Sequence, residues 1–282
     1  MIAIVDSGST KTNWLFTGDK EGIQIRTLGI NPYYQTADDI TDNLHKELVP
    51  NMPDIKHIEA IYFYGAGCEL PAQQAIVQKA IQPIFPHAKV SVDNDLIAAA
   101  RSLFGKESGI ACISGTGSNT CYYNGEKIER NINSLGLYMG DEGSGGYLGK
   151  LLVRDYLREV MPKEMRERFE VFTPDRRPDI MDKIYRKPFP NRYLASLAPF
   201  AILHQSDDYI QSLIMENFRL LFERCICQYP QHKTQPVRFI GSVALHLQPF
   251  LQKVADSFGV KVDNITNDPL PGLQEYHLNH RA

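Results

Sequence analysis

The sequence of 282 residues predicts an α/β protein built from two similar halves. In the first half, segments with strand character alternate with segments with helix character, which is typical of α/β proteins with a mixed sheet. A strand, a turn rich in glycine and hydroxyl residues, and a second strand occur at the start of the chain and again near Gly109. Since the length also favours two domains, we place their boundary near Lys106.

The first half opens with a hairpin, whose strands Met1–Val5 and Asn13–Phe16 flank the polar turn Asp6–Thr12. Thr36-Ala-Asp-Asp39 has the pattern of a capping box and predicts the start of a helix. Gly105 is placed to end the alanine-rich helix before it. We expect the remaining strands of this half at 23–28, 58–64 and 88–92, and its helices at 36–48, 71–81 and 94–104.

The second half repeats the strand, turn and strand, and then becomes largely helical. A glycine-rich segment at 136–149 leads into a helix at 151–160, and charged helical segments follow within 162–186. The other elements expected here are strands at 109–113, 121–123, 127–132, 237–241 and 261–265 and helices at 207–228, 242–258 and 271–280.

Composition excludes several classes of partner. The formal net charge of -3 gives no reason to expect nucleic acid or an anionic membrane as a partner. We find no segment long enough to span a membrane, and the chain begins with strand character rather than a signal peptide. The five cysteines lack the paired spacing of zinc or iron–sulfur ligands, which favours reduced thiols. We therefore expect a cytoplasmic protein.

The turn Asp6–Thr12 could bind a phosphate group. Its small residues, Ser9 and Thr10 among them, leave backbone N–H groups accessible, and Lys11 adds a positive charge. Asp6, at the end of the first strand, could hold a hydrated Mg2+, because this ion combines one or two carboxylates with water and phosphate oxygens. An ordinary polar hairpin turn is the alternative.

Asp93-Asn94-Asp95 stands directly before a predicted helix, where Asp and Asn are favoured as N-caps. The alternative is that Asp95 acts as a general base. A helix N-terminus stabilises the carboxylate and so makes it a weak base. Low basicity matters little for phosphoryl transfer, in which positioning dominates.

Three further segments could carry chemistry, although neither a Walker loop nor the dinucleotide glycine pattern is present. Ser114–Asn119 is a second candidate phosphate turn, and two such turns in similar halves are more specific than one. Gly140–Gly146 places two carboxylates before a helix, and helix capping explains one of them. Gly241–Ala244 lies where a strand passes into a helix, a position where a nucleotide can contact the backbone.

Three of these motifs resemble those of the sugar kinase/Hsp70/actin superfamily. Asp6–Thr12 is similar to its first phosphate motif, with Ser7 where glycine is more usual. Ser114–Asn119 is similar to its second phosphate motif, and Gly241–Ala244 to its adenosine motif.

Within that superfamily, the sequence resembles the N-acetylglucosamine kinases of the BadF/BadG-type ATPase family. Asn94-Asp95 with its alanine-rich helix, Ser114–Asn119 and Gly140–Ser144 carry this resemblance. Together with the superfamily motifs, the match spans nearly the whole chain in order. It implies two ribonuclease-H-like domains, 1–106 and 107–282, with ATP and sugar in a cleft between them. The second domain would be largely helical in its middle, and the final helix could pack back on the first.

The resemblance also implies roles for single residues. Asp95 would take the proton from the sugar 6-hydroxyl, and Asp6 would position Mg2+ through water. Residues implied to bind the nucleotide and its phosphates are Ser9, Thr10, Lys11, Gly115, Thr116, Gly117, Gly241 and Ser242. Residues implied to bind or flank the sugar are Asn31, Asn94, Ser118, Asn119, Ser134, Leu135, Gly136 and Asp141.

The expected activity is ATP-dependent phosphorylation of an amino sugar, N-acetylglucosamine first, to its 6-phosphate. Glucosamine, N-acetylmuramic acid and N-acetylmannosamine are alternative acceptors. An ATP-driven activator of an iron–sulfur dehydratase and a sugar-sensing regulator without catalysis are alternatives of other classes. The cysteine spacing argues against the activator, and Asp95 argues against the regulator. We also expect a homodimer.

Overall fold

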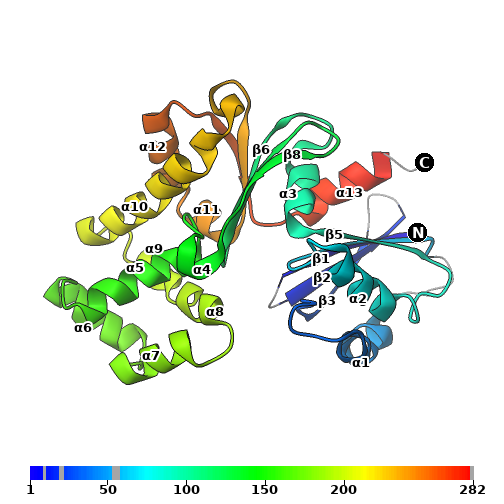
Figure 1. The fold of residues 1–282 in the computed structure, drawn as a ribbon, viewed down its shortest axis with the longest axis horizontal. Coiled ribbons are helices and arrows are strands. Elements are labelled where there is room, and N and C mark those ends of the chain that lie inside the picture. The colour runs from blue at the N-terminus through cyan, green and yellow to red at the C-terminus, as the bar shows by residue number, and fades with distance from the viewer. Residues whose placement is uncertain (9–10, 19–21, 53–57, 280–282) are drawn as a thin grey trace. The chain divides into compact units, whose positions relative to one another are not determined.

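The computed structural model describes residues 1–8, 11–18, 22–52 and 58–279. The chain divides into two compact units. The first unit comprises Met1–Lys106 and the segment that begins at Pro269, and the second comprises Glu107–Asp268. Within the described residues, each unit contains a mixed five-stranded sheet flanked by helices (Figure 1).

The sheet of the first unit has the strand order β3-β2-β1-β4-β5. The hairpin strands β1 and β2 pair antiparallel, as do β2 and β3, whereas β1, β4 and β5 are parallel. The register aligns Asp6 with Tyr64 and Tyr64 with Asp93, so the carboxyl ends of three parallel strands share one edge. The strands are β1 (Ile2–Ser7), β2 (Lys11–Thr17), β3 (Gly22–Leu28), β4 (Ala60–Gly65) and β5 (Lys89–Asn94).

Helices cover both faces of this sheet (Figure 1). Helices α1 (Ala37–Glu47) and α2 (Pro71–Ile81) pack over a core that includes Trp14 and Phe63. Helices α3 (Asp95–Phe104) and α13 (Leu270–Asn279) pack together on the opposite face. The predicted capping box of α1 is confirmed, and Gly105 ends α3 with a left-handed φ of 58°. A 3-10 turn, Val49–Asn51, follows α1.

The sheet of the second unit, β10-β9-β6-β7-β8, has the connectivity of the first, which supports the internal repeat. The sequence placed Ser118 and Asn119 in the turn, and this was wrong. Both pair across to β6 and belong to β7, so the turn is limited to Gly115–Gly117. The strands are β6 (Gly109–Ser114), β7 (Ser118–Tyr123), β8 (Ile128–Ile132), β9 (Val237–Ile240) and β10 (Val262–Thr266).

The helices of the second unit surround a core in which Leu148, Phe218 and Phe239 are buried. They are α4 (Gly136–Met139), α5 (Gly145–Leu157), α6 (Lys163–Phe172), α7 (Arg177–Tyr185), α8 (Pro190–Ala195), α9 (Ala198–Leu203), α10 (Asp208–Arg224), α11 (Ser242–His246) and α12 (Gln248–Phe258). Two 3-10 turns, Ile226–Gln228 and Pro230–Lys233, follow α10.

Two helix predictions in this unit need correction, and two short helices were missed. Helix α5 starts at Gly145 rather than near 151, because Ser144 caps it. The segment 242–258 forms two helices, since a break occurs at Leu247 and a proline opens α12. The short helices α8 and α9 have no strong periodic pattern and were not predicted.

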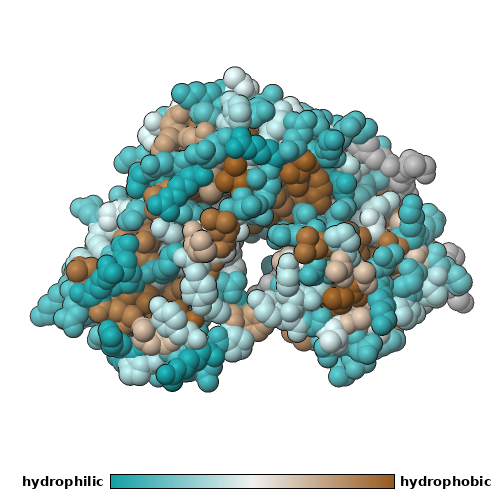
Figure 2. Space-filling model, viewed as in Figure 1, coloured by the Kyte–Doolittle hydropathy of each residue, from teal (hydrophilic) through white to brown (hydrophobic). Residues whose placement is uncertain are grey.

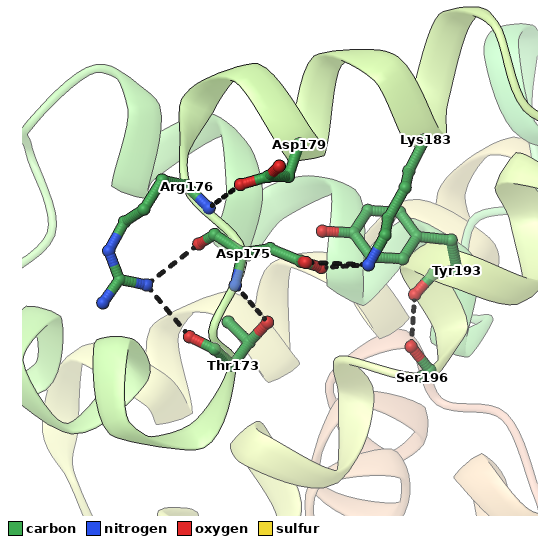
Figure 3. A network of polar contacts seen from close by, with 7 residues as sticks. All are labelled: Thr173, Asp175, Arg176, Asp179, Lys183, Tyr193 and Ser196. Atoms are coloured by element: carbon green, nitrogen blue, oxygen red, sulfur yellow. Dashed lines mark hydrogen bonds and ion pairs between the residues drawn. The ribbon is translucent and has the colours of Figure 1, made fainter.

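Polar contacts join the helices α6, α7 and α8 (Figure 3). The Lys183 ammonium lies 2.7 Å from both carboxylate oxygens of Asp175 and 4.9 Å from the ring centroid of Tyr193. Arg176 donates to the carbonyls of Thr173 and Asp175, each at 3.1 Å. These contacts fix the α6–α7 connection, and we assign them a structural role.

The surface seen in Figure 2 is mainly hydrophilic, with dispersed apolar areas, as is usual for globular proteins. Within the described residues, none of the helices is both long enough and apolar enough to span a bilayer.

Candidate active site

In the first unit, the carboxyl-terminal edge of β1, β4 and β5 gathers the predicted site residues. Asp6 is half-buried at the end of β1, and Asp95 directly follows β5. Lys11 is exposed at the start of β2, and its carbonyl accepts a hydrogen bond from Gly8 N at 2.9 Å. The predicted phosphate ligands Ser9 and Thr10 lie outside the described residues.

Buried hydroxyls hold this hairpin against the chain that leads to Asn31. Ser7 Oγ and Thr12 Oγ1 lie 2.7 Å apart, and Ser7 Oγ accepts a hydrogen bond from Ile30 N at 3.1 Å. Both side chains are buried, so their hydroxyls have a structural role. The predicted sugar ligand Asn31 is 8% exposed. A Cβ at Gly67 would lie 2.6 Å from Asn31 Oδ1, so this position requires glycine.

Asn94, rather than Asp95, is the N-cap of α3, because Asn94 Oδ1 accepts a hydrogen bond from Ile97 N at 2.9 Å. The capping explanation for Asp95 is therefore wrong. Asp95 is the half-buried first residue of the helix. Burial, and to a smaller extent the negative charge of Glu69, raises the pKa of its carboxyl to about 6. Burial outweighs the helix N-terminus, so Asp95 is a stronger base than the sequence indicated.

In the second unit, the turn between β6 and β7 is attached to the N-terminus of α5. Gly145 N donates to Gly115 O at 2.8 Å, and Gly146 N donates to Thr116 O at 3.0 Å. Ser114 Oγ donates to Gly143 O at 2.6 Å. The turn carbonyls thus satisfy helix N–H groups that would otherwise lack partners. This arrangement fixes the predicted phosphate turn, in which Thr116 is exposed.

The carboxylate of Asp141 lies beneath the same turn. Asp141 is 7% exposed, and its Oδ1 accepts a hydrogen bond from Ser118 N at 3.4 Å. Burial raises the pKa of this carboxyl to about 6. Its backbone φ of 64° is left-handed, which is uncommon for a residue other than glycine. Such backbone strain concentrates at functional sites.

Neither carboxylate of the Gly140–Gly146 segment caps α5, contrary to the sequence-based explanation. Ser144 Oγ is the cap and accepts a hydrogen bond from Tyr147 N at 3.0 Å. Glu142 is buried and pairs with Arg224 Nη1 at 2.7 Å. Glu142 therefore has a structural partner, and Asp141 remains the candidate for substrate binding.

The segment before Asp141 carries the predicted residues Ser134, Leu135 and Gly136. Leu135 and Gly136 have consecutive left-handed φ values of 60° and 69°, and the Leu135 side chain is 61% exposed. A Cβ at Gly140 would lie 1.8 Å from Ser134 O. The chain therefore makes a tight turn, which Asp141 N closes with a 3.0 Å hydrogen bond to Ser134 O.

Of the remaining predicted sugar ligands, Asn119 is already engaged in the sheet. Its Oδ1 accepts hydrogen bonds from Thr120 N at 2.9 Å and from Asn131 Nδ2 at 2.8 Å. Ser118 is buried in β7 and contacts Asp141 through its backbone N–H, as described above.

Gly241, the first residue of the predicted adenosine motif, contacts the end of β6 directly. It has a φ of 133°, and a Cβ there would lie 2.1 Å from Ser114 O. Ser242 follows as the exposed first residue of α11. The second unit thus brings together the phosphate turn, Asp141 and the adenosine motif.

The sequence reasoning missed Asn217, which supports this site from α10. It is fully buried, its Oδ1 accepts a hydrogen bond from Gly143 N at 2.7 Å, and its Nδ2 donates to Ser144 O at 3.2 Å. An amide on the apolar face of a long helix was the available signal, because buried polar groups are normally hydrogen-bonded.

Comparison with solved structures places the fold among known proteins. A proposed N-acetylglucosamine kinase from Porphyromonas gingivalis has a TM-score of 0.96 and 38% identity, with all of both chains covered. A second proposed N-acetylglucosamine kinase, from Chromobacterium violaceum, has a TM-score of 0.71 and 17% identity over 98% of each chain. A glucokinase of the ROK family from Streptomyces griseus, solved with glucose and AMPPNP, has a TM-score of 0.58 and 16% identity over 96% of each chain.

Searches against models of protein families and against curated proteins found no match. The two units have the fold of the actin-like ATPases that include the sugar kinases. The chain belongs to the family of N-acetylglucosamine kinase-like proteins, and it is a sugar kinase.

Proposed function

We propose that this kinase transfers the γ-phosphoryl group of ATP to the 6-hydroxyl of N-acetylglucosamine. The observation that carries the proposal is the state of Asp95. Its carboxylate is half-buried, it does not cap α3 because Asn94 does, and its pKa is raised to about 6. A general base is most effective when its pKa is close to the working pH. The similarity to the Porphyromonas gingivalis protein supports the acceptor.

In the proposed reaction, Asp95 accepts the proton of the sugar 6-hydroxyl as its oxygen bonds to the γ-phosphorus. The bond from that phosphorus to the β–γ bridging oxygen breaks, and ADP leaves. Little covalent chemistry falls to the protein in such a transfer, so the position of each group is decisive.

The phosphate ligands proposed for this reaction are Lys11 and the turn residues Gly115, Thr116 and Gly117, together with Ser9 and Thr10. We assign the adenosine to Gly241 and Ser242. Asn31, Asn94, Ser118, Asn119, Ser134, Leu135, Gly136 and Asp141 are proposed to bind or flank the sugar.

Asp6 is the proposed residue for Mg2+. Its half-buried carboxylate lies at the strand edge that also carries Asp95, and oxygen donors are the ligands that Mg2+ prefers. A bound Mg2+ would neutralise charge on the phosphate oxygens.

Replacement of Gly241 by alanine tests the nucleotide assignment. The new Cβ would collide with Ser114 O, so the end of β6 and its phosphate turn must shift. Because displacements of about 1 Å can cost about 100-fold in rate, we expect the KM for ATP to rise at least tenfold and kcat to fall. Gly259→Ala is the matched control, since Gly259 also has a left-handed φ, of 65°, but nothing within 4 Å of its Cβ position. An unchanged KM for ATP in Gly241→Ala would contradict the assignment.

The activator of an iron–sulfur dehydratase is the competing function. All five cysteines are free thiols, and four of them are buried. The described residues contain no group of three or more His, Cys, Asp or Glu side chains that could hold a metal ion. We expect turnover to require Mg2+ or Mn2+, to stop with a chelator, and to proceed in protein without iron. A brown preparation with iron–sulfur absorbance would support the activator instead.

The homodimer and the cytoplasmic location stay predictions. Analytical ultracentrifugation of the purified protein measures the first, and cell fractionation measures the second.

A further inference from the structure

Helix α13 packs directly against α3, the helix that begins with Asp95. Ser102 Oγ on α3 donates to Pro269 O at 2.9 Å. A Cβ at Gly272 would lie 2.2 Å from Ser102 O, so the two helices approach as closely as glycine permits. A displacement of α13 would therefore also displace α3.

A chain of four polar side chains, which we call the His277–Asp93 chain, also connects these elements. His277 Nε2 lies 2.8 Å from the Tyr64 hydroxyl oxygen, and Arg101 Nη1 donates to that oxygen at 2.9 Å. Arg101 Nη1 also pairs with Asp93 Oδ2 at 3.1 Å. The His277 ring stacks on Tyr62, with centroids 3.7 Å apart.

Arg101 is the donor in two links of this chain, because its guanidinium can only donate: the Tyr64 oxygen and Asp93 Oδ2 accept from it. In the third link the Tyr64 hydroxyl and His277 Nε2 share one hydrogen bond, and the tautomer of His277 sets which of them donates. Tyr64 is 1% exposed and His277 is 7% exposed. Because an unpaired polar group is costly at such burial, the chain holds one arrangement.

The far end of the chain lies at the start of α3. Asp93 is the penultimate residue of β5, and Asp95 begins the helix two positions later. Arg101 lies further along α3 and reaches back to Asp93. The ion pair between Arg101 and Asp93 therefore fixes the orientation of α3 relative to β5, at the junction where Asp95 lies.

We propose that α13 is a positioning element for Asp95 and acts through the His277–Asp93 chain. This inference rests on the proposed role of Asp95 as the base. Since α13 follows the second unit in the sequence, the catalytic geometry of the first unit is completed by residues from the end of the chain.

Removing either end of the Tyr64–His277 hydrogen bond tests the proposal. Tyr64→Phe and His277→Phe keep aromatic rings and lose the bond. We expect kcat to fall roughly 10- to 100-fold in each, as for a base displaced by up to 1 Å, with the KM for sugar and for ATP within about twofold of wild type. The double variant should be no worse than the poorer single one, because both remove the same link.

Thr27→Val is the matched control. It removes another buried hydrogen bond of the same sheet, from Trp14 Nε1 to Thr27 Oγ1 at 3.1 Å, on the edge strand β3. This variant should lose thermal stability as Tyr64→Phe does and keep the wild-type kcat. The proposal would be overturned if Tyr64→Phe had the kcat of wild type. It would also be overturned if Thr27→Val lost as much kcat as Tyr64→Phe.

Hydrogen exchange at Ile97 N–H, which Asn94 caps, gives a readout that needs no activity. We expect faster exchange there in Tyr64→Phe and His277→Phe, and an unchanged rate in Thr27→Val. Unchanged exchange in all three variants would overturn the coupling between α13 and α3. Wild-type protein that phosphorylates no sugar would refute the proposed function instead, and the exchange rates would still decide the coupling.

Discussion

Replacement of Asp95 by asparagine should lower kcat by roughly 10²- to 10⁴-fold, the usual contribution of a general base. The variant keeps the side-chain shape and cannot accept the proton. Because Asn94 caps α3, no cap is lost, and the helix should stay folded. Steady-state kinetics with saturating ATP and sugar measure the change. Residual turnover above about a tenth of wild type, less than the smallest usual effect of a base, would show that Asp95 is not the base.

The pH dependence of the melting temperature of Asp95→Asn tests independently whether the pKa of Asp95 is raised. Burial raises the Asp95 pKa from 3.8 to about 6, so ionisation of this carboxylate opposes folding. The loss of folding free energy from this ionisation is absent below about pH 4, where Asp95 is protonated in both the folded and the unfolded protein. It is complete above about pH 6, where Asp95 is ionised in both. We expect Asp95→Asn to melt at or above the wild-type temperature near pH 8 and at the same temperature near pH 3.

Asp38→Asn is the matched control for both measurements. Asp38 is an exposed acidic residue in the first turn of α1, in the same unit. Its removal should leave kcat unchanged and cost a few tenths of a kcal/mol of stability at most, as is usual for an exposed charge near a helix N-terminus. The wild-type kcat/KM should also fall as pH drops below about 6, because Asp95 then becomes protonated.

Replacement of Asp141 by alanine should raise the KM for the sugar by roughly 10- to 150-fold and leave the KM for ATP within about twofold. The size follows from the loss of a hydrogen bond to a charged group, about 1.5–3 kcal/mol. The carboxylate is buried and accepts a hydrogen bond from Ser118 N. We propose that it also accepts one from a substrate hydroxyl. Initial rates over a matrix of sugar and ATP concentrations separate the two constants.

Glu142→Gln is the control for Asp141→Ala. Glu142 is the next residue, equally buried, and its carboxylate pairs with Arg224. This substitution should lower the melting temperature and leave the KM for the sugar unchanged. If Asp141→Ala raised both KM values equally, or neither, Asp141 would be a structural residue of the turn.

The sequence predicted the sheets well, because alternating and apolar runs ending in glycine or polar turns specify strands directly. It could not identify the cap of α3. Asp93, Asn94 and Asp95 are all good caps, and only the backbone shows that Asn94 takes the position. The start of α5 was missed because Gly145 and Gly146 disfavour helix. Glycine is nevertheless needed at Gly146, where a Cβ would lie 2.9 Å from Thr116 O of the phosphate turn.

The sequence motifs identified the residues of the candidate site, but they did not indicate the pKa values of its carboxylates. The raised pKa values of Asp95 and Asp141 depend on burial, which neighbours in the sequence do not reveal. The contact between Tyr64 and His277 joins residues 213 positions apart, so no local pattern could indicate it.

The most direct test of the proposed function is product analysis across a panel of amino sugars. Purified protein would be incubated with Mg·ATP and N-acetylglucosamine, glucosamine, N-acetylmuramic acid or N-acetylmannosamine, and the products identified by phosphorus NMR and mass spectrometry. We predict the highest kcat/KM for N-acetylglucosamine, with the phosphate on the 6-oxygen and one ADP per sugar phosphate. A higher kcat/KM for another sugar, phosphate on another oxygen, or ADP release without a sugar phosphate would contradict the proposal.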